Sequence, residues 1–476
     1  MSALVITGGT VVTATRTTRA DVRVENGRII EVGPNLNADD AQVMDATGCY
    51  VLPGGVDVHT HFDLTVNGLK VSDGFESGTM SALCGGTTTI VEHPGFAEDG
   101  SLFTPLADTR THALNRAATD FGVHGVVSRV DENTPEDLAT LVHGGVPSVK
   151  VYTTYAGRLN DDQLATVLAA MGRENGLVTV HAENHAAITQ LTADLRAKGE
   201  TTPPAHPASR PGWCEAEAVQ RLIALAKAAG NAPLYIVHLS TKAGLEHVRA
   251  AKAEGLPVYA ETCPHYLLLT DERYERPGSE ALQYVMSPPL RTPEDREALW
   301  QGLADGTIDT VATDHCCFSL QQKIERGGNN VFDCPGGIPG AETRLPLLWS
   351  EGVAKNRLTM NRFVELISTA PARIMGLAPA KGDIAPGADA DIVIFDPHAP
   401  RTISPEALAH PADYTPFAGM EVPGWPRAVL LRGEVGAREG RFTGRPGMGH
   451  YVPRTPDIHR SNARQSQGYQ RITEEP

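Results

Sequence analysis

Five short segments carry side chains that could bind a metal ion, and each lies within or at the end of an apolar run typical of a buried strand. The first is His59-Thr-His61, whose imidazoles, two residues apart on a strand, point to the same side. Imidazole nitrogens and carboxylates suit zinc or another divalent transition metal. The predicted metal-binding residues are His59, His61, Lys150, His181, His238 and Asp314.

A lone histidine or aspartate at a strand end is more often structural, so the prediction depends on the agreement of five strands at once. His181-Ala-Glu-Asn-His185 differs from a HExxH motif because its glutamate is third instead of second, so His185 is predicted to be a packing residue. His124 and His265 have no neighbouring ligand in the sequence, which favours structural roles. Cys316-Cys317 has no adjacent base and is predicted to form pocket wall.

Lys150 is the unexpected member of the set, because it stands in the apolar strand Ser148-Val-Lys-Val-Tyr152. Burial of an ammonium is costly and lowers its pKa from about 10.4, which makes the neutral amine accessible. A neutral amine can react with CO₂ to give a carbamate, a two-oxygen anion able to bridge two metal ions. An ion pair between Lys150 and a barrel carboxylate is the alternative, and the spacing leaves both readings open.

Strands and helices that alternate from residue 55 onward are expected to position these side chains. Strand-like runs cover 56–62, 88–93, 123–128, 148–153, 178–181, 235–239, 258–262 and 310–314, and amphipathic stretches between them include 162–175, 215–229 and 242–254. This repeated alternation predicts an α/β fold, a closed (β/α)₈ TIM-like barrel. Functional groups of such barrels lie at the carboxyl ends of the strands, where the predicted ligands fall.

Both ends of the chain are rich in short β-like runs, including 4–10, 21–25, 28–32, 391–395 and 428–432. We therefore predict a small β-sandwich domain made of residues 1–54 and 379–452, separated in the sequence by the barrel at 55–378. Residues 453–476 are polar and lack periodicity, which predicts an extended arm, disordered or laid on a neighbouring subunit.

The composition excludes several classes of partner. Lys+Arg 41 against Asp+Glu 57 gives a net charge of −16, which opposes binding to nucleic acid or an anionic membrane. No apolar run reaches the ~18 residues of a membrane span, and Met1–Thr10 lacks the features of a signal peptide. Seven scattered cysteines without a CxxC pair indicate reduced thiols, so we expect a cytoplasmic protein.

Taken as a set, the motifs resemble those of the cyclic amidohydrolases: hydantoinases, dihydropyrimidinases, allantoinases and, more distantly, dihydroorotases. The resemblance runs in family order from residue 3 to about residue 450. Its motifs are Gly55-Val-Asp-Val-His-Thr-His61, Gly85-Gly-Thr-Thr-Thr89, Lys150-Val-Tyr-Thr-Thr-Tyr155, Val180-His-Ala-Glu-Asn184, Val237-His-Leu-Ser240, Glu261-Thr-Cys-Pro-His265, Ser287-Pro-Pro-Leu-Arg291, Thr313-Asp-His315, Pro335-Gly-Gly-Ile-Pro-Gly-Ala-Glu-Thr-Arg344 and Gly387-Ala-Asp-Ala-Asp391.

The resemblance implies a centre of two divalent metal ions, zinc or alternatively manganese, cobalt or iron(II). It assigns His59, His61 and Asp314 to one ion and His181 and His238 to the other. A CO₂-derived carbamate on Lys150 would bridge them, and Asp314 would also carry the proton during catalysis.

Further contacts are implied for a small-molecule substrate. Tyr155 matches an oxyanion-stabilising tyrosine, and Ser287 and the backbone near Gly336 match positions that hold the amide edge. Phe62 and Leu64 would form a wall for the exocyclic group. His93 stands where relatives often have phenylalanine and could add a polar group to the pocket rim. Relatives are commonly tetramers, so we expect a homo-oligomer, a tetramer or a dimer.

The implied reaction is opening of a hydantoin or dihydropyrimidine ring to an N-carbamoyl amino acid. Pro339–Arg344 and Met420–Trp425 favour a hydantoinase, whereas Cys263-Pro-His-Tyr266 favours an allantoinase, the alternative. A dihydroorotase is disfavoured because Phe62-Asp63 replaces the arginine typical of that family. A non-catalytic assembly protein related to dihydropyrimidinase is disfavoured because all six ligands are present. The sequence leaves the ring substrate, its stereochemistry and the metal open.

Overall fold

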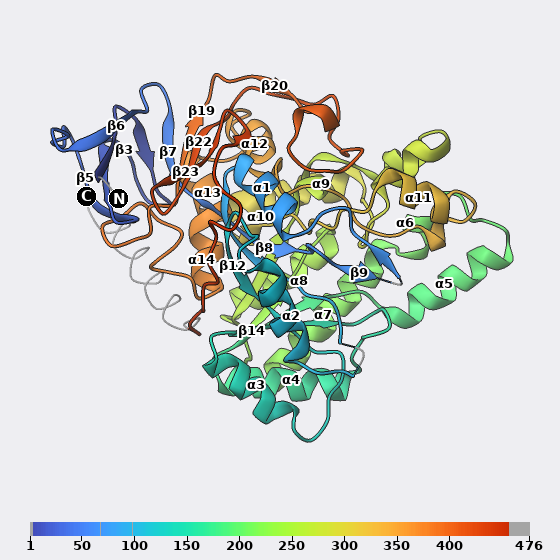
Figure 1. Cartoon of the computed structure of the whole chain (residues 1–476). Coiled ribbons are helices and arrows are strands. Elements are labelled where there is room, and N and C mark those ends of the chain that lie inside the picture. The colour runs from blue at the N-terminus through green and yellow to red at the C-terminus, as the bar shows by residue number, and fades with distance from the viewer. Residues whose placement is uncertain (1–2, 67, 98, 457–476) are drawn as a thin grey trace, which may run out of the picture.

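The centre of the computed structural model, which describes residues 3–66, 68–97 and 99–456, is a ring of parallel strands (Figure 1). Each strand pairs with the next along the chain: β8 (Gly55–Thr60), β11 (Thr87–Glu92), β12 (Asp120–Val123) with β13 (Gly125–Val126), β14 (Ser148–Tyr152), β15 (Leu177–His181), β16 (Leu234–Ile236), β17 (Val258–Thr262) and β18 (Thr310–Val311). Only His124 separates β12 from β13, and a parallel bridge between Thr60 and His315 joins the last strand to the first. This order of parallel strands agrees with the predicted α/β barrel.

Helices follow the strands and cover the outside of the ring (Figure 1). α4 is an example of why they form, because Asn160 caps its first turn by accepting a hydrogen bond from the Gln163 amide at 2.9 Å, while Leu164, Val167 and Leu168 are buried. The helices are α1 (Phe75–Cys84), α2 (Thr104–Ala113), α3 (Thr134–His143), α4 (Asp161–Arg173), α5 (His185–Ala197), α6 (Ala205–Ser209), α7 (Gly212–Ala228), α8 (Lys242–Ala253), α9 (Pro264–Leu268), α10 (Pro293–Asp305), α11 (Leu320–Gly327), α12 (Arg344–Leu348), α13 (Met360–Val364) and α14 (Ala370–Ile374).

Two sheets lie at one side of the barrel, and the larger one combines strands from both ends of the chain, seen as blue and orange-red arrows side by side in Figure 1. One has the order β5-β4-β1-β6 and the other β24-β23-β22-β19-β7-β2-β3. Their bounds are β1 (Ala3–Thr7), β2 (Thr10–Val12), β3 (Thr17–Arg19), β4 (Asp21–Glu25), β5 (Arg28–Gly33), β6 (Ala41–Asp45), β7 (Tyr50–Pro53), β19 (Ile392–Asp396), β22 (Trp425–Leu431), β23 (Glu434–Arg438) and β24 (Arg441–Phe442). Ile6, Val22, Ile392 and Leu430 lie in one shared core. The predicted sandwich from both chain ends is thereby confirmed.

A buried ion cluster fastens the barrel to the C-terminal strands. The Lys381 ammonium lies 2.5 Å from an Asp120 carboxylate oxygen at the start of β12 and 2.7 Å from Asp391, which precedes β19. A buried ammonium is tolerated when it is paired, and these carboxylates raise the pKa of Lys381 in spite of its burial. The strands of the sandwich are therefore held directly against the barrel.

The first residues of the predicted arm pack on the barrel. Arg454 is buried, its amide donates to the Gly145 carbonyl at 2.9 Å, and its guanidinium donates to the Val123 carbonyl at 2.6 Å. The remainder of the predicted arm, residues 457–476, lies outside the described residues. Among the helices that the structure describes, none has the length and apolar character needed to cross a membrane.

Three barrel strands differ in extent from the prediction. β16 ends at Ile236 and β18 at Val311, although the sequence predicted strands reaching residues 239 and 314. The reason is that His238 and Asp314 have φ angles of 40° and 49°, which no ladder residue adopts. The third strand begins at Asp120 and is interrupted at His124. The predicted ligands on strands six and eight therefore stand on the loops just beyond the ladder.

Candidate metal centre

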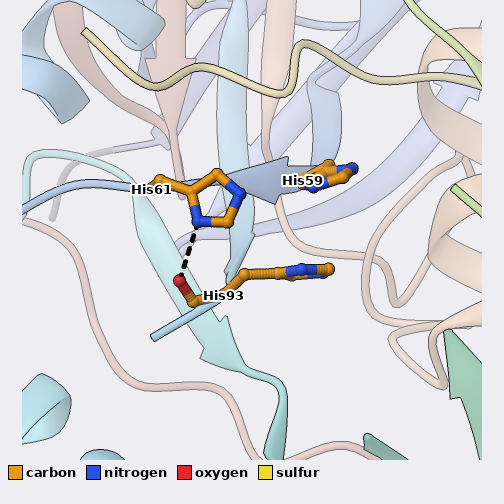
Figure 2. A group of neighbouring side chains, drawn as sticks. All are labelled: His59, His61 and His93. Atoms are coloured by element: carbon orange, nitrogen blue, oxygen red, sulfur yellow. Dashed lines mark hydrogen bonds between the residues drawn. The ribbon is translucent and has the colours of Figure 1, made fainter. Parts of the chain in front are cut away.

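His59, His61 and Asp314 lie together at the carboxyl end of β8. The Nε2 atoms of His59 and His61 are 3.1 and 3.3 Å from the same Asp314 carboxylate oxygen. Each ring is oriented through its other nitrogen, because His59 Nδ1 donates to Glu261 at 2.7 Å and His61 Nδ1 donates to the His93 carbonyl at 3.1 Å (Figure 2). Both Nε2 atoms are thus left free for a metal ion.

His181 and His238 form a second pair of nitrogens. His181 Nε2 donates to the Glu183 carboxylate at 2.7 Å, which leaves Nδ1 as the free nitrogen. This Nδ1 lies 2.8 Å from His238 Nε2. The two ring centroids are 4.5 Å apart, and the His238 ring is 5.5 Å from that of His59. The two groups of ligands are therefore adjacent.

Lys150 lies beside the first group of ligands. Its side chain is buried in β14, and its Nζ atom is 3.5 Å from His59 Nε2. Desolvation lowers the pKa of Lys150 to about 8, although Asp314 and Glu261 act in the opposite direction. A fraction of the amine is thus neutral near pH 7, as carbamate formation requires.

Glu261, at the end of β17, orients ligands of both groups. One carboxylate oxygen accepts from His59 Nδ1 at 2.7 Å and from the His238 amide at 3.0 Å. The other accepts from the Tyr235 hydroxyl at 2.9 Å. Its side chain is fully buried. No role for Glu261 could be predicted from the sequence, since a glutamate in a strand carries no signal of which side chains it faces.

His93 lies beneath the ligands. It is fully buried, its ring stacks on His59 with centroids 4.3 Å apart, and it meets His124 edge-on at 4.1 Å. Within the part of the chain that the structure describes, neither ring nitrogen has a hydrogen-bond partner. One nitrogen each of His59, His61 and His93 lies within 4.8 Å of the others (Figure 2). The expectation that His93 adds a polar group to the pocket rim stays a prediction, and in the structure its ring is buried among other histidines.

Tyr155, Ser287 and Gly336 lie on the open side of the centre. Tyr155 is 36% exposed, and its ring is 4.9 Å from that of His181. Partial burial raises the pKa of Tyr155 to about 12, against the lowering effects of nearby Arg210 and of a hydrogen bond with Ser287. A Cβ built on Gly336 would lie 3.8 Å from the Met286 backbone, so this glycine adjoins the Ser287 segment.

Phe62 and Leu64 occupy different environments. Phe62 is buried, packed on Phe75 and His315 with ring centroids 6.1 and 5.1 Å away. Its ring belongs to the packing beneath α1, which does not support the predicted contact with substrate. Leu64 is half-buried and packs against a small apolar cluster that contains Cys316. Cys316 is therefore beside the residues after β8, as a wall residue would be.

Phe96 is a residue at this mouth that the sequence analysis did not single out. It is 44% exposed, and its ring is 5.2 Å from that of Tyr152. Tyr152 in turn lies 6.0 Å from the rings of Tyr155 and His181. Aromatic side chains therefore flank the second ligand pair.

Three further histidines that the sequence suggested as structural, His124, His185 and His265, lie against other protein groups. His124 contacts the Val58 carbonyl at 3.1 Å and the Ser148 hydroxyl at 2.7 Å, and His185 contacts the Thr154 hydroxyl at 3.2 Å. The His265 ring lies on Tyr266, with centroids 4.1 Å apart.

A second group of possible ligands, Asp73, His315 and Cys317, is also buried. His315 Nε2 donates to Asp73 at 2.5 Å, and its Nδ1 accepts from the Gly340 and Ala341 amides at 3.0 and 3.1 Å. Both ring nitrogens are therefore used by the protein, and we interpret this group as a brace between loops.

Comparisons with known proteins identify the family. The model of the Amidohydrolase family matches residues 50–436. D-phenylhydantoinase of Escherichia coli K12 is 44% identical over 457 residues, which cover 96% of this chain and 99% of the relative. The chain therefore belongs to the amidohydrolase family, among the cyclic amidohydrolases related to hydantoinases and dihydropyrimidinases.

Solved structures agree with this placement. Dihydropyrimidinase from Brevibacillus agri superposes with a TM-score of 0.94 at 40% identity, covering 95% of this chain and 99% of the other. L-hydantoinase (dihydropyrimidinase) from Arthrobacter aurescens superposes with a TM-score of 0.88 at 31% identity, covering 95% and 100%. The resemblance read from the motifs is thereby confirmed, and family membership implies a divalent metal centre.

Proposed function

We propose that this protein hydrolyses the ring amide of a hydantoin or dihydropyrimidine and releases an N-carbamoyl amino acid. The observation that carries the proposal is the convergence of four imidazoles, one carboxylate and one buried amine at the carboxyl rim of the barrel. In each of His59, His61 and His181 the nitrogen that faces away from this point is hydrogen-bonded. Relatives over nearly the full chain are hydantoinases by name.

The residues fit two divalent metal ions. His59, His61 and Asp314 would hold one ion, and His181 and His238 the other. Carbamate formation would join the neutral Lys150 amine to the carbon of CO₂ and release one proton, which would give an anion with two oxygen atoms. Bound divalent ions supply an activated water and polarise the ring carbonyl. The nitrogen-rich donor set suits zinc, with manganese, cobalt or iron(II) as alternatives.

The protein's own side chains would handle the proton and the developing charge. Asp314, within 3.3 Å of both strand-one imidazoles, is placed to accept a proton from the attacking water and return it to the leaving nitrogen. Tyr155 would donate a hydrogen bond to the oxyanion. Ser287, next to Tyr155, and the backbone at Gly336 would hold the amide edge of the ring.

The walls of the mouth favour an uncharged exocyclic group. Leu64, Phe96 and Tyr152 are apolar or aromatic side chains that are at least partly exposed. Asp63, in the loop after β8, is paired with Lys70 at 2.9 Å. Lys70 is thus already paired with an anion, which disfavours a substrate whose recognition requires binding of a free carboxylate.

We further propose a homo-oligomer in the cytoplasm, a tetramer or a dimer. The seven cysteines are all unpaired, which supports a reducing compartment. Light scattering of the purified protein tests the assembly. A monomer at micromolar concentration would contradict it.

The substrate proposal is tested by assaying metal-loaded protein on hydantoin, 5-substituted hydantoins, dihydrouracil, allantoin and dihydroorotate, with product identification by mass spectrometry. We expect the highest kcat/KM on a hydantoin or dihydrouracil. A highest value on allantoin would reassign the enzyme as an allantoinase. A highest value on dihydroorotate, or no hydrolysis of any ring, would overturn the proposal.

A further inference from the structure

Arg210 contacts both the second ligand pair and Tyr155, although no motif above includes it. It stands between α6 and α7, and its side chain is only 13% exposed. Its carbonyl accepts from Arg291 at 2.5 Å, and Arg291 in turn donates to the Ser240 hydroxyl at 3.0 Å. The Arg210 backbone is therefore anchored to the loop that follows His238.

One edge of the Arg210 guanidinium supports the predicted metal ligand His181 through Glu183. Arg210 Nη1 forms an ion pair with the Glu183 carboxylate oxygen that also accepts from His181 Nε2. The Glu183 side chain is fully buried, and a buried carboxylate is costly unless it is paired. The Glu183 amide donates to the Thr153 hydroxyl at 2.9 Å, which fixes its backbone. Arg210 thus stabilises the charged carboxylate that directs His181 Nδ1 toward His238.

The face of the same guanidinium lies over Tyr155. The guanidinium carbon is 5.4 Å from the centroid of the tyrosine ring, within the range of a cation–π contact. Tyr155 needs such support, because its φ of 73° is a left-handed conformation that a bulky residue adopts only when its surroundings hold it. The ring of His181 is a second neighbour of the Tyr155 ring, with centroids 4.9 Å apart.

We propose that Arg210 is a positioning residue that couples the two halves of the site. Through Glu183 it holds His181 in the tautomer that can bind a metal ion, and through its face it holds Tyr155 over the same ligand. The inference rests on the proposed function, in which Tyr155 stabilises the oxyanion. Loss of Arg210 would therefore disturb metal binding and catalysis by separate routes.

A double-mutant cycle tests the route through Tyr155. Arg210→Met keeps an unbranched stem and removes the guanidinium. With metal at saturation, Arg210→Met should lower kcat about tenfold or more in the wild-type background, with a smaller change in KM. In a Tyr155→Phe background the same change should lower kcat by less than about twofold, because the hydroxyl that Arg210 positions is gone. Equal losses in both backgrounds would overturn this half of the proposal.

Metal release tests the route through Glu183. Dissociation of the more weakly held metal is followed with a chromophoric chelator, without substrate. Arg210→Met and Glu183→Gln should each weaken retention of that ion by about 10–100-fold, and Tyr155→Phe should not. Wild-type retention in Arg210→Met would overturn this half. Arg210→Lys keeps a positive charge for Glu183, so it should retain more metal than Arg210→Met. It provides the test if Arg210→Met destabilises the fold.

Arg158→Met is the matched control. Arg158 is exposed, lies in the loop of Tyr155 and donates to the Tyr155 carbonyl at 3.2 Å, whereas the ion pairs that Glu183 forms among the described residues are with Arg210 and His181. The same loss of charge there should leave metal release unchanged. A wild-type protein inactive on every ring amide would overturn the proposed function. If the wild type is active but Arg210→Met lowers kcat equally with and without Tyr155→Phe, only the route through Tyr155 is overturned.

Discussion

Glu261→Gln should weaken metal binding while the protein stays folded. The carboxylate accepts hydrogen bonds from His59 Nδ1, the His238 amide and the Tyr235 hydroxyl. Glutamine keeps the shape and one acceptor oxygen, which can serve His59 and His238. Its NH₂ group would face the Tyr235 hydroxyl, which can accept from it. The packing is therefore preserved, and the negative charge is lost.

The magnitude follows from the bond to His59. A hydrogen bond to a charged group contributes about 1.5–3 kcal/mol and a neutral one about 0.5–1.5 kcal/mol. Partners that orient metal-bound histidines typically change metal affinity by about 10–100-fold, or about 1.4–2.7 kcal/mol. We expect a loss in this range for Glu261→Gln. Glu261→Ala should cost more stability, since it leaves two buried donors, His59 Nδ1 and the His238 amide, without this acceptor.

Competition with a chromophoric chelator measures the affinity, and thermal melts of the metal-free protein report folding. Glu342→Gln is the control, because Glu342 is also buried but accepts from the Ser81 hydroxyl and the Ala409 amide, away from the ligands. If Glu261→Gln binds metal as tightly as wild type, Glu261 does not orient His59 for metal binding. Equal losses in both variants would indicate a general effect of removing a buried carboxyl group.

Four further predictions follow from the same geometry. Lys150→Ala should hold less than one metal per subunit by elemental analysis and lose turnover, with partial rescue by short carboxylic acids; full activity would contradict a bridging carbamate. Asp314→Asn keeps a ligand oxygen, so steady-state kinetics should show kcat reduced by about 10²–10⁴ with less metal loss than in the histidine variants. A variant with a tenth of wild-type kcat would assign proton transfer elsewhere. Tyr155→Phe should lower kcat by about 10²–10³ with a smaller change in KM, whereas normal kcat with raised KM would limit Tyr155 to substrate binding. Burial raises the pKa of Glu342 from 4.5 to about 8, so its contribution to the free energy of unfolding is lost as pH rises through that window. Urea unfolding of Glu342→Gln should show a shallower decline between pH 5 and 8, and an unchanged slope would refute the shift.

The barrel and its ligands could be predicted because their signals are local. Apolar runs separated by amphipathic stretches indicate parallel strands, and the rule that active groups occupy strand ends brings distant histidines together. The i, i+2 spacing of His59 and His61 requires only the geometry of one strand. These inferences need no knowledge of which side chains touch across the ring.

Contacts between strands could not be predicted in the same way. Glu261, Glu183 and Arg210 act on ligands from neighbouring strands or loops. The residues next to them in the sequence do not indicate which side chains they contact. The left-handed conformations of His238 and Asp314 were missed because neither is a glycine, although both residue types tolerate such angles.

The side-chain directions of residues just beyond a strand were equally hidden. His93 and Phe62 follow strand ends, which suggested a place at the mouth. Both are buried instead, one against imidazoles and the other against Phe75. The direction of a side chain just after a strand depends on the path of the loop that follows. The alternation of apolar and polar residues does not indicate that path.

The proposed centre consists of two metal ions bridged by a modified lysine. A crystal structure of the metal-loaded protein, with anomalous data collected above the absorption edge of the metal, tests it directly. We expect two anomalous peaks per subunit, one beside His59, His61 and Asp314 and one beside His181 and His238. Density should continue from Lys150 Nζ to a carboxylate between them. A single peak, peaks away from these residues, or a bare amine on Lys150 between two ions would contradict the account.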